Sequence, residues 1–98
     1  MRYLISEKAK QDIEKIWLYT YENWSLEQAD RYYNLILDEI EFIAENFESG
    51  KSADYIKKGY RASIVKSHII FYKKSRNNIV EIIRILHQKM DMENRIDE

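Results

Sequence analysis

Hydrophobic residues recur at spacings of three and four in the first half of the chain, which is typical of amphipathic helices. Ser6 offers a side-chain oxygen to cap a helix beginning at Glu7. The capping box Ser25-Leu26-Glu27-Gln28 starts a second helix directly afterwards, so the pair predicts a helical hairpin. The apolar stripes comprise Ala9, Ile13, Ile16, Trp17, Tyr21 and Trp24 in the first helix, and Leu26, Ala29, Tyr33, Ile36, Leu37, Ile40, Ile43, Ala44 and Phe47 in the second.

After residue 59 the pattern changes to the short β-branched and aromatic runs that are typical of strands. Residues 60–65, 68–72 and 79–86 predict three strands, and the short connections between them make neighbouring strands antiparallel. Residues 2–5 predict an opening strand, and residues 48–59, ESGKSADYIKKG, predict a loop used for binding or mobile. The expected order is βααβββ: an α+β fold whose helical hairpin packs on one face of a small, mainly antiparallel sheet.

The length of 98 residues predicts a single domain, 1–98, in which we expect residues 90–98 to form a C-terminal tail. The chain has no cysteine, which excludes disulfides and thiolate metal sites and fits a reducing compartment. No apolar run approaches the roughly 20 residues that span a bilayer, and the first residues lack the apolar core of a signal peptide. These features predict a cytoplasmic protein with no membrane association.

Charge is distributed unevenly, although the net charge is only -1. Residues 1–50 contain 5 Lys/Arg and 11 Asp/Glu, whereas residues 51–89 contain 10 and 2, and residues 90–98 contain 1 and 4. The acidic helices and the basic strands therefore predict two different surfaces. The near-zero net charge argues against a general nucleic-acid binder, and we expect no direct sequence-specific DNA binding by this chain alone.

Most kinds of catalytic or metal site have no basis in this sequence. A metal site is not expected, because the only histidines, His68 and His87, lie at opposite ends of different predicted strands. The sequence has no Gly-x-Ser-x-Gly nucleophile motif and too few glycines for a phosphate-binding loop. We expect neither a cofactor nor a metal.

Two arginines, Arg61 and Arg84, lie inside predicted strands instead of at turns. Each could form a structural ion pair, for Arg84 with Glu81 or a helix glutamate, or each could belong to a functional surface. His87, which follows the last strand, could bond a backbone carbonyl or act as a proton acceptor. Cations beside a base are what RNA cleavage by 2′-hydroxyl attack requires, so the residues for a ribonuclease would be Arg61, Arg84, His87 and Lys89.

Four segments in order resemble the ParE branch of the RelE/ParE toxin superfamily. They are SEKAKQDIEKIWLYTYENW, QADRYYNLILDEIEFIAE, GYRASIVKSHIIFYKK and IVEIIRILHQKMD. The resemblance implies the βααβββ fold and a toxin of a type II toxin–antitoxin system. It also implies neutralisation by a ParD-like antitoxin in a hetero-oligomer, and DNA gyrase as a target that is inhibited by binding without catalysis.

Two alternatives to the gyrase-inhibiting toxin stay open at this point. The first is a RelE-like ribosome-dependent mRNA interferase, although the strand at residues 68–72 lacks the arginine that those nucleases place there. The second is a non-toxic binding module. The expected target-binding residues are Arg61, Arg84, His87, Lys89, Met90 and Asp91, and the expected antitoxin-binding residues are Trp17, Tyr21, Tyr60 and Arg61.

Overall fold

The computed structural model describes residues 2–96, in which three helices and a 3₁₀ turn accompany one five-stranded sheet. The elements in chain order are β1 (Tyr3–Ile5), α1 (Glu7–Asn23), α2 (Leu26–Glu45), the 3₁₀ turn η1 (Phe47–Ser49), β2 (Lys51–Ser52), β3 (Arg61–Val65), β4 (His68–Lys74), β5 (Val80–His87) and α3 (Met92–Arg95). The predicted βααβββ order is confirmed, and β2, η1 and α3 are additions to it. Within this range no helix is long and apolar enough to cross a membrane.

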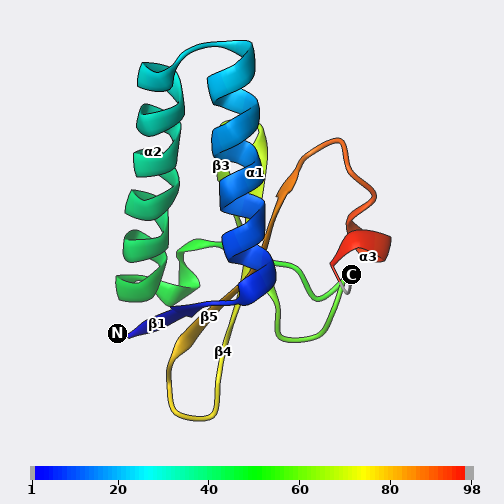
Figure 1. Ribbon diagram of the computed structural model, residues 1–98. Coiled ribbons are helices and arrows are strands. Elements are labelled where there is room, and N and C mark those ends of the chain that lie inside the picture. The colour runs from blue at the N-terminus through cyan, green and yellow to red at the C-terminus, as the bar shows by residue number, and fades with distance from the viewer. Residues whose placement is uncertain (1, 97–98) are drawn as a thin grey trace.

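The strand order in the sheet is β1-β5-β4-β3-β2. The pairs β2–β3, β3–β4 and β4–β5 are antiparallel, whereas β1 pairs in parallel with β5. The helical hairpin of α1 and α2 lies over one face of this sheet, and its tip extends well beyond the end of the strands (Figure 1). The predicted α+β architecture is therefore confirmed, with a mixed but mostly antiparallel sheet.

Side-chain caps start both long helices at the predicted residues. The Ser6 hydroxyl accepts a hydrogen bond from the backbone N–H of Ala9 at 3.0 Å, and the Ser25 hydroxyl accepts one from that of Gln28 at 3.1 Å. Each bond satisfies an amide that has no partner inside the helix. Only Ser25 and the C-cap residue Trp24 separate α1 from α2, which forces the two helices into an antiparallel hairpin.

Two apolar clusters lie on the two faces of the sheet. The cluster under the hairpin joins buried residues of α1 and α2 to the inner side of the strands, and Ile36, Ile40 and Ile43 of α2 are completely buried in it. The opposite cluster is built around Phe71 and Leu86. It is covered by the segment between β2 and β3 and by Ile96, so the sheet is buried on both sides.

The segments predicted as a loop and as a tail both pack on this second face. Ala53 is fully buried and Ile56 packs against the cluster, so the predicted binding loop contributes to the core. Met92 packs there too, and Ile96 is buried at 4% exposure. Up to residue 96 the predicted tail thus contains a short helix, α3, and is held to the core by Met92 and Ile96; residues 97–98 lie outside the described residues.

Arg84 forms a buried ion pair with Asp12 of α1. Its Nε and Nη2 atoms donate to the two carboxylate oxygens at 2.8 and 3.0 Å, and its Nη1 donates to the backbone carbonyl of Arg95 at 2.6 Å. One oxygen of Asp12 also accepts from the backbone N–H of Ile85 at 3.0 Å. Arg84 is therefore structural, and its partner is the aspartate and not Glu81 or a helix glutamate.

Arg61 and Arg84, which were both expected among the target-binding residues, do not share a face of the sheet. Arg61 is paired with Tyr72, which belongs to the cluster under the hairpin, whereas Arg84 is paired with Phe71 of the opposite cluster. A β-bulge between these two pairs inserts Ile83 as an extra residue in β5. The arginines consequently lie on opposite faces of the sheet.

Replacing Asp12 with asparagine should destabilise the protein strongly, because the guanidinium of Arg84 would stay buried without its anion. We expect the free energy of unfolding to fall by roughly 3–5 kcal/mol in urea titrations. Hydrogen exchange should also accelerate in α3, whose Arg95 carbonyl is bonded by the same guanidinium.

The control for this variant is Lys10→Gln, which removes the exposed ion pair of Lys10 with Glu7. Exposed pairs of this kind are worth about 0–1 kcal/mol. A loss for Asp12→Asn as small as that of Lys10→Gln would contradict the structural role assigned to the buried pair.

Candidate functional site

A groove of about 910 Å³ opens where the hairpin extends past the end of the sheet. One wall comes from α1 and α2, and the floor comes from the β3–β4 turn and the end of β5. The lining residues are Lys15, Ile16, Tyr19, Thr20 and Trp24 of the first helix and its cap, Gln28, Arg31, Tyr32 and Leu35 of the second, and Lys66, Ser67, His68, His87 and Met90 of the floor. A concave site of this size, mostly apolar with a few polar groups, is the usual form of a binding site.

The charged side chains that line the groove are all cationic: Lys15, Arg31 and Lys66. No aspartate or glutamate is among the described lining residues, although the chain as a whole is slightly acidic. Glu27 offsets part of the charge of Arg31 through an exposed ion pair at 3.2 Å. The groove is therefore suited to an apolar segment that also carries negative charge.

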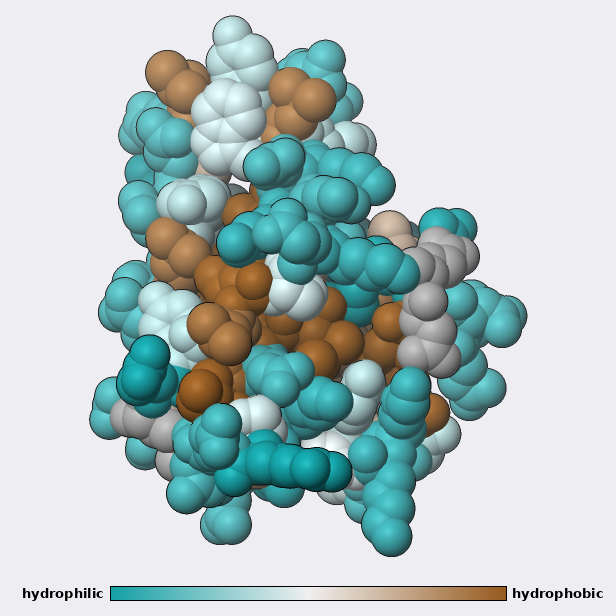
Figure 2. Space-filling model, turned by 60° about the horizontal axis from the view of Figure 1, so that its bottom comes forward, coloured by the Kyte–Doolittle hydropathy of each residue, from teal (hydrophilic) through white to brown (hydrophobic). Residues whose placement is uncertain are grey.

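The hairpin tip above the groove exposes an unusual amount of aromatic and aliphatic surface. Trp24 is 75% exposed and Tyr19 65%, and Leu18 and Leu26 are about half exposed beside them. Figure 2 shows apolar and near-neutral side chains together at this end of the molecule. Exposed aromatic residues beside a cationic groove are typical of a protein-binding surface.

The floor of the groove brings His68 and His87 together. They are directly paired across β4 and β5, and their rings meet edge to face with centroids 5.2 Å apart. Lys66 lies beside them in the turn before β4, where its φ of 54° is in the left-handed region. The sequence had suggested that the two histidines lie at opposite ends of their strands; because β4 and β5 are antiparallel, those ends coincide.

Hydrogen bonds indicate which ring nitrogen donates and which accepts in each of the two histidines. The Tyr32 hydroxyl donates to the Val65 carbonyl at 3.1 Å and lies 2.6 Å from Nδ1 of His68. Since that hydroxyl has one proton, both contacts are hydrogen bonds only if His68 Nδ1 donates, which leaves Nε2 as an acceptor. His87 Nδ1 accepts from the Lys89 backbone N–H at 3.1 Å, so its proton is on Nε2.

Burial keeps His68 neutral at physiological pH. Desolvation is the main cause that lowers its pKa from 6.5 to about 4, the neighbouring His87 lowers it further, and Asp12 opposes the shift. An uncharged imidazole in a groove lined by cations can accept a proton when an anion arrives.

Comparison with known proteins identifies the family of the chain. Residues 3–92 match the family model of the ParE toxin of type II toxin-antitoxin system, parDE. The chain belongs to the ParE toxin family. It is 35% identical over 95 residues to Toxin ParE1 of Mycobacterium tuberculosis, covering 97% of each chain. It is 39% identical over 89 residues to Toxin ParE1 of Caulobacter vibrioides, covering 91% of each.

The fold is that of a solved structure described as the chromosomal ParDE TA system from P. aeruginosa. The TM-score is 0.77 at 16% sequence identity, over 89% of this chain and 95% of the other. The resemblance to ParE noted from the sequence is thereby confirmed, and the protein is a ParE toxin of a type II toxin–antitoxin system.

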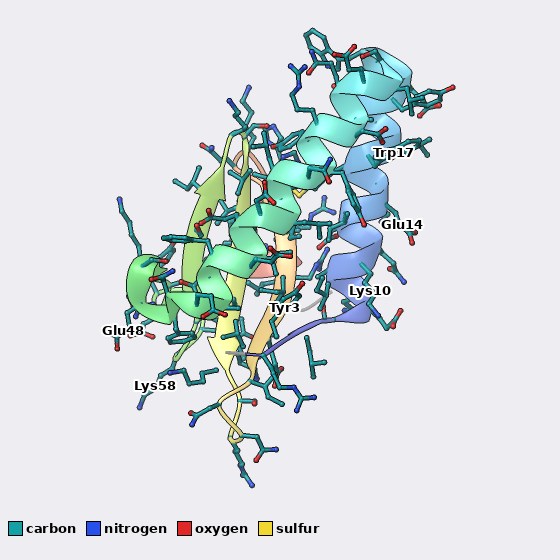
Figure 3. All side chains as sticks on the ribbon, turned by 90° about the vertical axis from the view of Figure 1, so that its left-hand side faces the viewer. Tyr3, Lys10, Glu14, Trp17, Glu48 and Lys58 are labelled. Carbon is teal, nitrogen blue, oxygen red and sulfur yellow. The ribbon has the colours of Figure 1, made fainter. Side chains whose placement is uncertain are left out.

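The residues predicted to bind an antitoxin do not line the groove of this ParE toxin. Trp17 is half-buried, stacks on Tyr21 with centroids 5.3 Å apart, and donates through its indole N–H to Asp30 at 3.0 Å. Figure 3 shows Trp17 above Glu14 and Lys10 along α1.

Two further residues that were predicted to contact the antitoxin, Tyr60 and Arg61, hold the fold together. Tyr60 is buried in the cluster on the face opposite the hairpin. Arg61 donates to the backbone carbonyls of Glu48 at 3.0 Å and Gly50 at 2.6 Å, and it lies over the ring of Phe47. Arg61 therefore holds η1 against the sheet.

The residues predicted to bind the target separate into two groups. Arg84 is buried and Arg61 is bound to backbone carbonyls, whereas His87, Lys89, Met90 and Asp91 follow one another at the exit of β5. His87 and Met90 also line the groove. The four residues proposed for a ribonuclease do not converge, because two of them are structural and lie on opposite faces of the sheet.

Sequence reasoning missed most of the groove. Tyr32 lines it, although the helical stripe had assigned the neighbouring Tyr33 to the buried side. Trp24 was expected to be covered and is the most exposed large apolar residue of α1 and its cap. The hairpin passes the end of the sheet because α1 begins partway along β5, where the Ser6 N–H bonds the Ile82 carbonyl, and this offset leaves no local signal in the sequence.

Replacing His68 with glutamine should reduce the dependence of stability on pH. The pKa of His68 is lowered on folding, so between about pH 6.5 and 4 the unfolded chain binds more protons, and stability falls as the pH falls. Between about pH 7 and 4.5 we expect the wild type to lose on the order of 1–2 kcal/mol more than the variant, after discounting for solvent screening at this half-buried ring. Urea titrations at both pH values measure this difference, and equal losses in the two proteins would contradict it.

Proposed function

We propose that this ParE toxin arrests growth by binding DNA gyrase without performing chemistry, and that a ParD-like antitoxin neutralises it by occupying the groove. The observation that supports this proposal is the overlap of two surfaces. His87 and Met90 belong both to the floor of the groove and to the β5 exit that we assign to the target. A segment lying in the groove would therefore cover part of the target surface.

The antitoxin side of the proposal rests on chemistry. A segment that folds on binding can place apolar side chains against Tyr19, Trp24 and Leu35, and acidic side chains near Lys15 and Lys66. A second point of attachment is available at the edge of the sheet. β2 pairs only with Arg61 and Ala62, so among the described residues the rest of β3 has no partner strand on that side.

The target side rests on the segment at the end of β5. Lys89 and Asp91 are exposed there, and Met90 is 42% exposed. This short run of mixed charge around an apolar residue is held in place because α3 and Ile96 anchor the chain that follows it. We assign gyrase recognition to His87, Lys89, Met90 and Asp91, in the cytoplasm, where gyrase works.

The main alternative, a ribosome-dependent mRNA interferase, has weaker support. Two of its three cations would be Arg61 and Arg84, and both are used to hold the structure together. Operator binding by a toxin–antitoxin hetero-oligomer would have to come from the antitoxin, because the toxin has a net charge of -1.

The target can be tested directly with purified toxin. Incubation with gyrase and supercoiled plasmid should trap the cleaved DNA complex and give linear plasmid, whereas mRNA on translating ribosomes should stay intact. Lys89→Glu should raise the toxin concentration needed by about tenfold, because it reverses a charge in the assigned surface. Lys58→Glu is the matched control, since Lys58 lies at the end of the molecule away from the hairpin tip (Figure 3).

The other outcomes decide between the alternatives. Cut mRNA with untouched plasmid would establish the interferase instead of the gyrase inhibitor. Neither product, together with normal growth on expression, would indicate a non-toxic binding module. An equal effect of the two lysine variants would reject the assigned surface while leaving gyrase as the target.

Antitoxin docking can be tested with a pair of tryptophan and tyrosine variants. Trp24→Ala should weaken binding of the antitoxin encoded next to the toxin by roughly 10–100-fold in calorimetry, because a large aromatic contact in the groove is lost. Tyr55→Ala is the control: Tyr55 is 73% exposed, close to the 75% of Trp24, but does not line the groove. Equal effects of the two changes would place the antitoxin elsewhere.

A further inference from the structure

His68 and His87, in the floor of the groove, each have one ring nitrogen that makes no hydrogen bond to the part of the chain that the structure describes. Within residues 2–96, Nδ1 of each ring is bonded, to Tyr32 and to the Lys89 backbone N–H, while Nε2 of each ring has no hydrogen-bond partner. As derived above, Nε2 of His87 carries a proton and Nε2 of His68 has a lone pair. The two rings of the floor, which meet edge to face with centroids 5.2 Å apart, thus have one donor atom and one acceptor atom that make no hydrogen bond among the described residues.

One added proton would turn this pair into two donors. A carboxylate has only acceptor atoms, and it would then receive a hydrogen bond from each Nε2. Lys66, in the adjacent turn, would supply a further positive charge, and no described lining residue carries a competing carboxylate.

We propose that His68 and His87 form a carboxylate-binding subsite of the groove, which takes one aspartate or glutamate side chain of the antitoxin together with one proton. This inference rests on the proposed function, because it assumes that the antitoxin occupies the groove. It adds a recognition rule: the antitoxin must place an acidic side chain over the histidine pair, and it binds more tightly as the pH falls.

The surroundings of the pair determine how the proton is taken up. The titratable or charged groups of the elements around it are Asp12, Lys15 and Tyr19 of α1, Arg31 and Tyr32 of α2, and Lys66 of the turn. Burial of His68 and the neighbouring His87 oppose protonation of the empty floor, whereas Asp12 favours it. A bound carboxylate would add a negative charge in direct contact with both rings, and this favours the protonated form.

Calorimetry of the toxin with the antitoxin encoded beside it tests the subsite. In two buffers of different ionisation enthalpy near pH 7, the wild type should take up a fraction of a proton on binding, and the affinity should rise by about tenfold from pH 8 to pH 6. His87→Gln and His68→Gln should each remove most of this uptake. Using both histidine variants ensures that a folding defect in one of them does not decide the result, and thermal unfolding shows whether each variant is folded.

A variant that removes one lysine charge distinguishes proton uptake by the histidines from electrostatic attraction between the groove and the antitoxin. Lys66→Asn removes a positive charge beside the pair while leaving both histidines in place, and asparagine tolerates the left-handed backbone at this position. It should weaken binding by a similar factor at pH 6 and pH 8, with the proton uptake unchanged. Lys58→Gln, at the far end of the molecule, should change neither quantity.

A double-mutant cycle identifies the acidic partner. Each acidic residue of the antitoxin's toxin-binding segment is changed to its amide and combined with His87→Gln, and one position should show non-additive effects of about fivefold or more. Equal affinity at both pH values, uptake that survives both histidine changes, or additivity at every position would overturn the subsite while leaving the proposed function intact. No binding at all would overturn the proposed function, and the subsite with it.

Discussion

The ion pair between Asp12 and Arg84 is the interaction on which the rest of this structure depends. It lies where β1, only three residues long, has stopped covering the edge of β5. There Ser6 donates hydrogen bonds to the carbonyls of Ile82 and Ile83. Farther along β5, Asp12 accepts hydrogen bonds from the Ile85 N–H and from Arg84. The same guanidinium reaches the Arg95 carbonyl. One buried carboxylate thereby connects the first helix, β5 and the C-terminal segment.

That connection determines which surface is left for partners. Because the C-terminal segment is held on the second face of the sheet, the chain between β5 and α3 has to turn, and this turn carries Met90 to the groove. Because α1 begins partway along β5, where Ser6 bonds the Ile82 carbonyl, and runs past the end of that strand, the last turns of the hairpin have no sheet to cover. Their aromatic residues become a binding wall and not part of the core.

Arginine has two different structural uses on the two faces. Arg61 fixes η1 by bonding the backbone carbonyls of Glu48 and Gly50, and Tyr72 supports the same segment by donating to the carbonyl of Phe47 at 2.8 Å. Arg84 instead fixes α1 and the C-terminal segment to β5. Around the groove and at the β5 exit, the positive charges exposed to a partner therefore come from lysines and from Arg31.

The sequence by itself determined the elements and their order, because helix caps and hydrophobic spacing are local properties. Ser6, Ser25 and the stripe through Ile36, Ile40 and Ile43 lie where the pattern predicted. It could not give β2 or η1, which are too short to show a period. The faces of Arg61 and Arg84, the burial of Tyr60 and the meeting of His68 with His87 were decided only by the tertiary structure. They depend on strand pairing, on the bulge that inserts Ile83 and on how far the hairpin overhangs the sheet, which are relations between segments far apart in the chain.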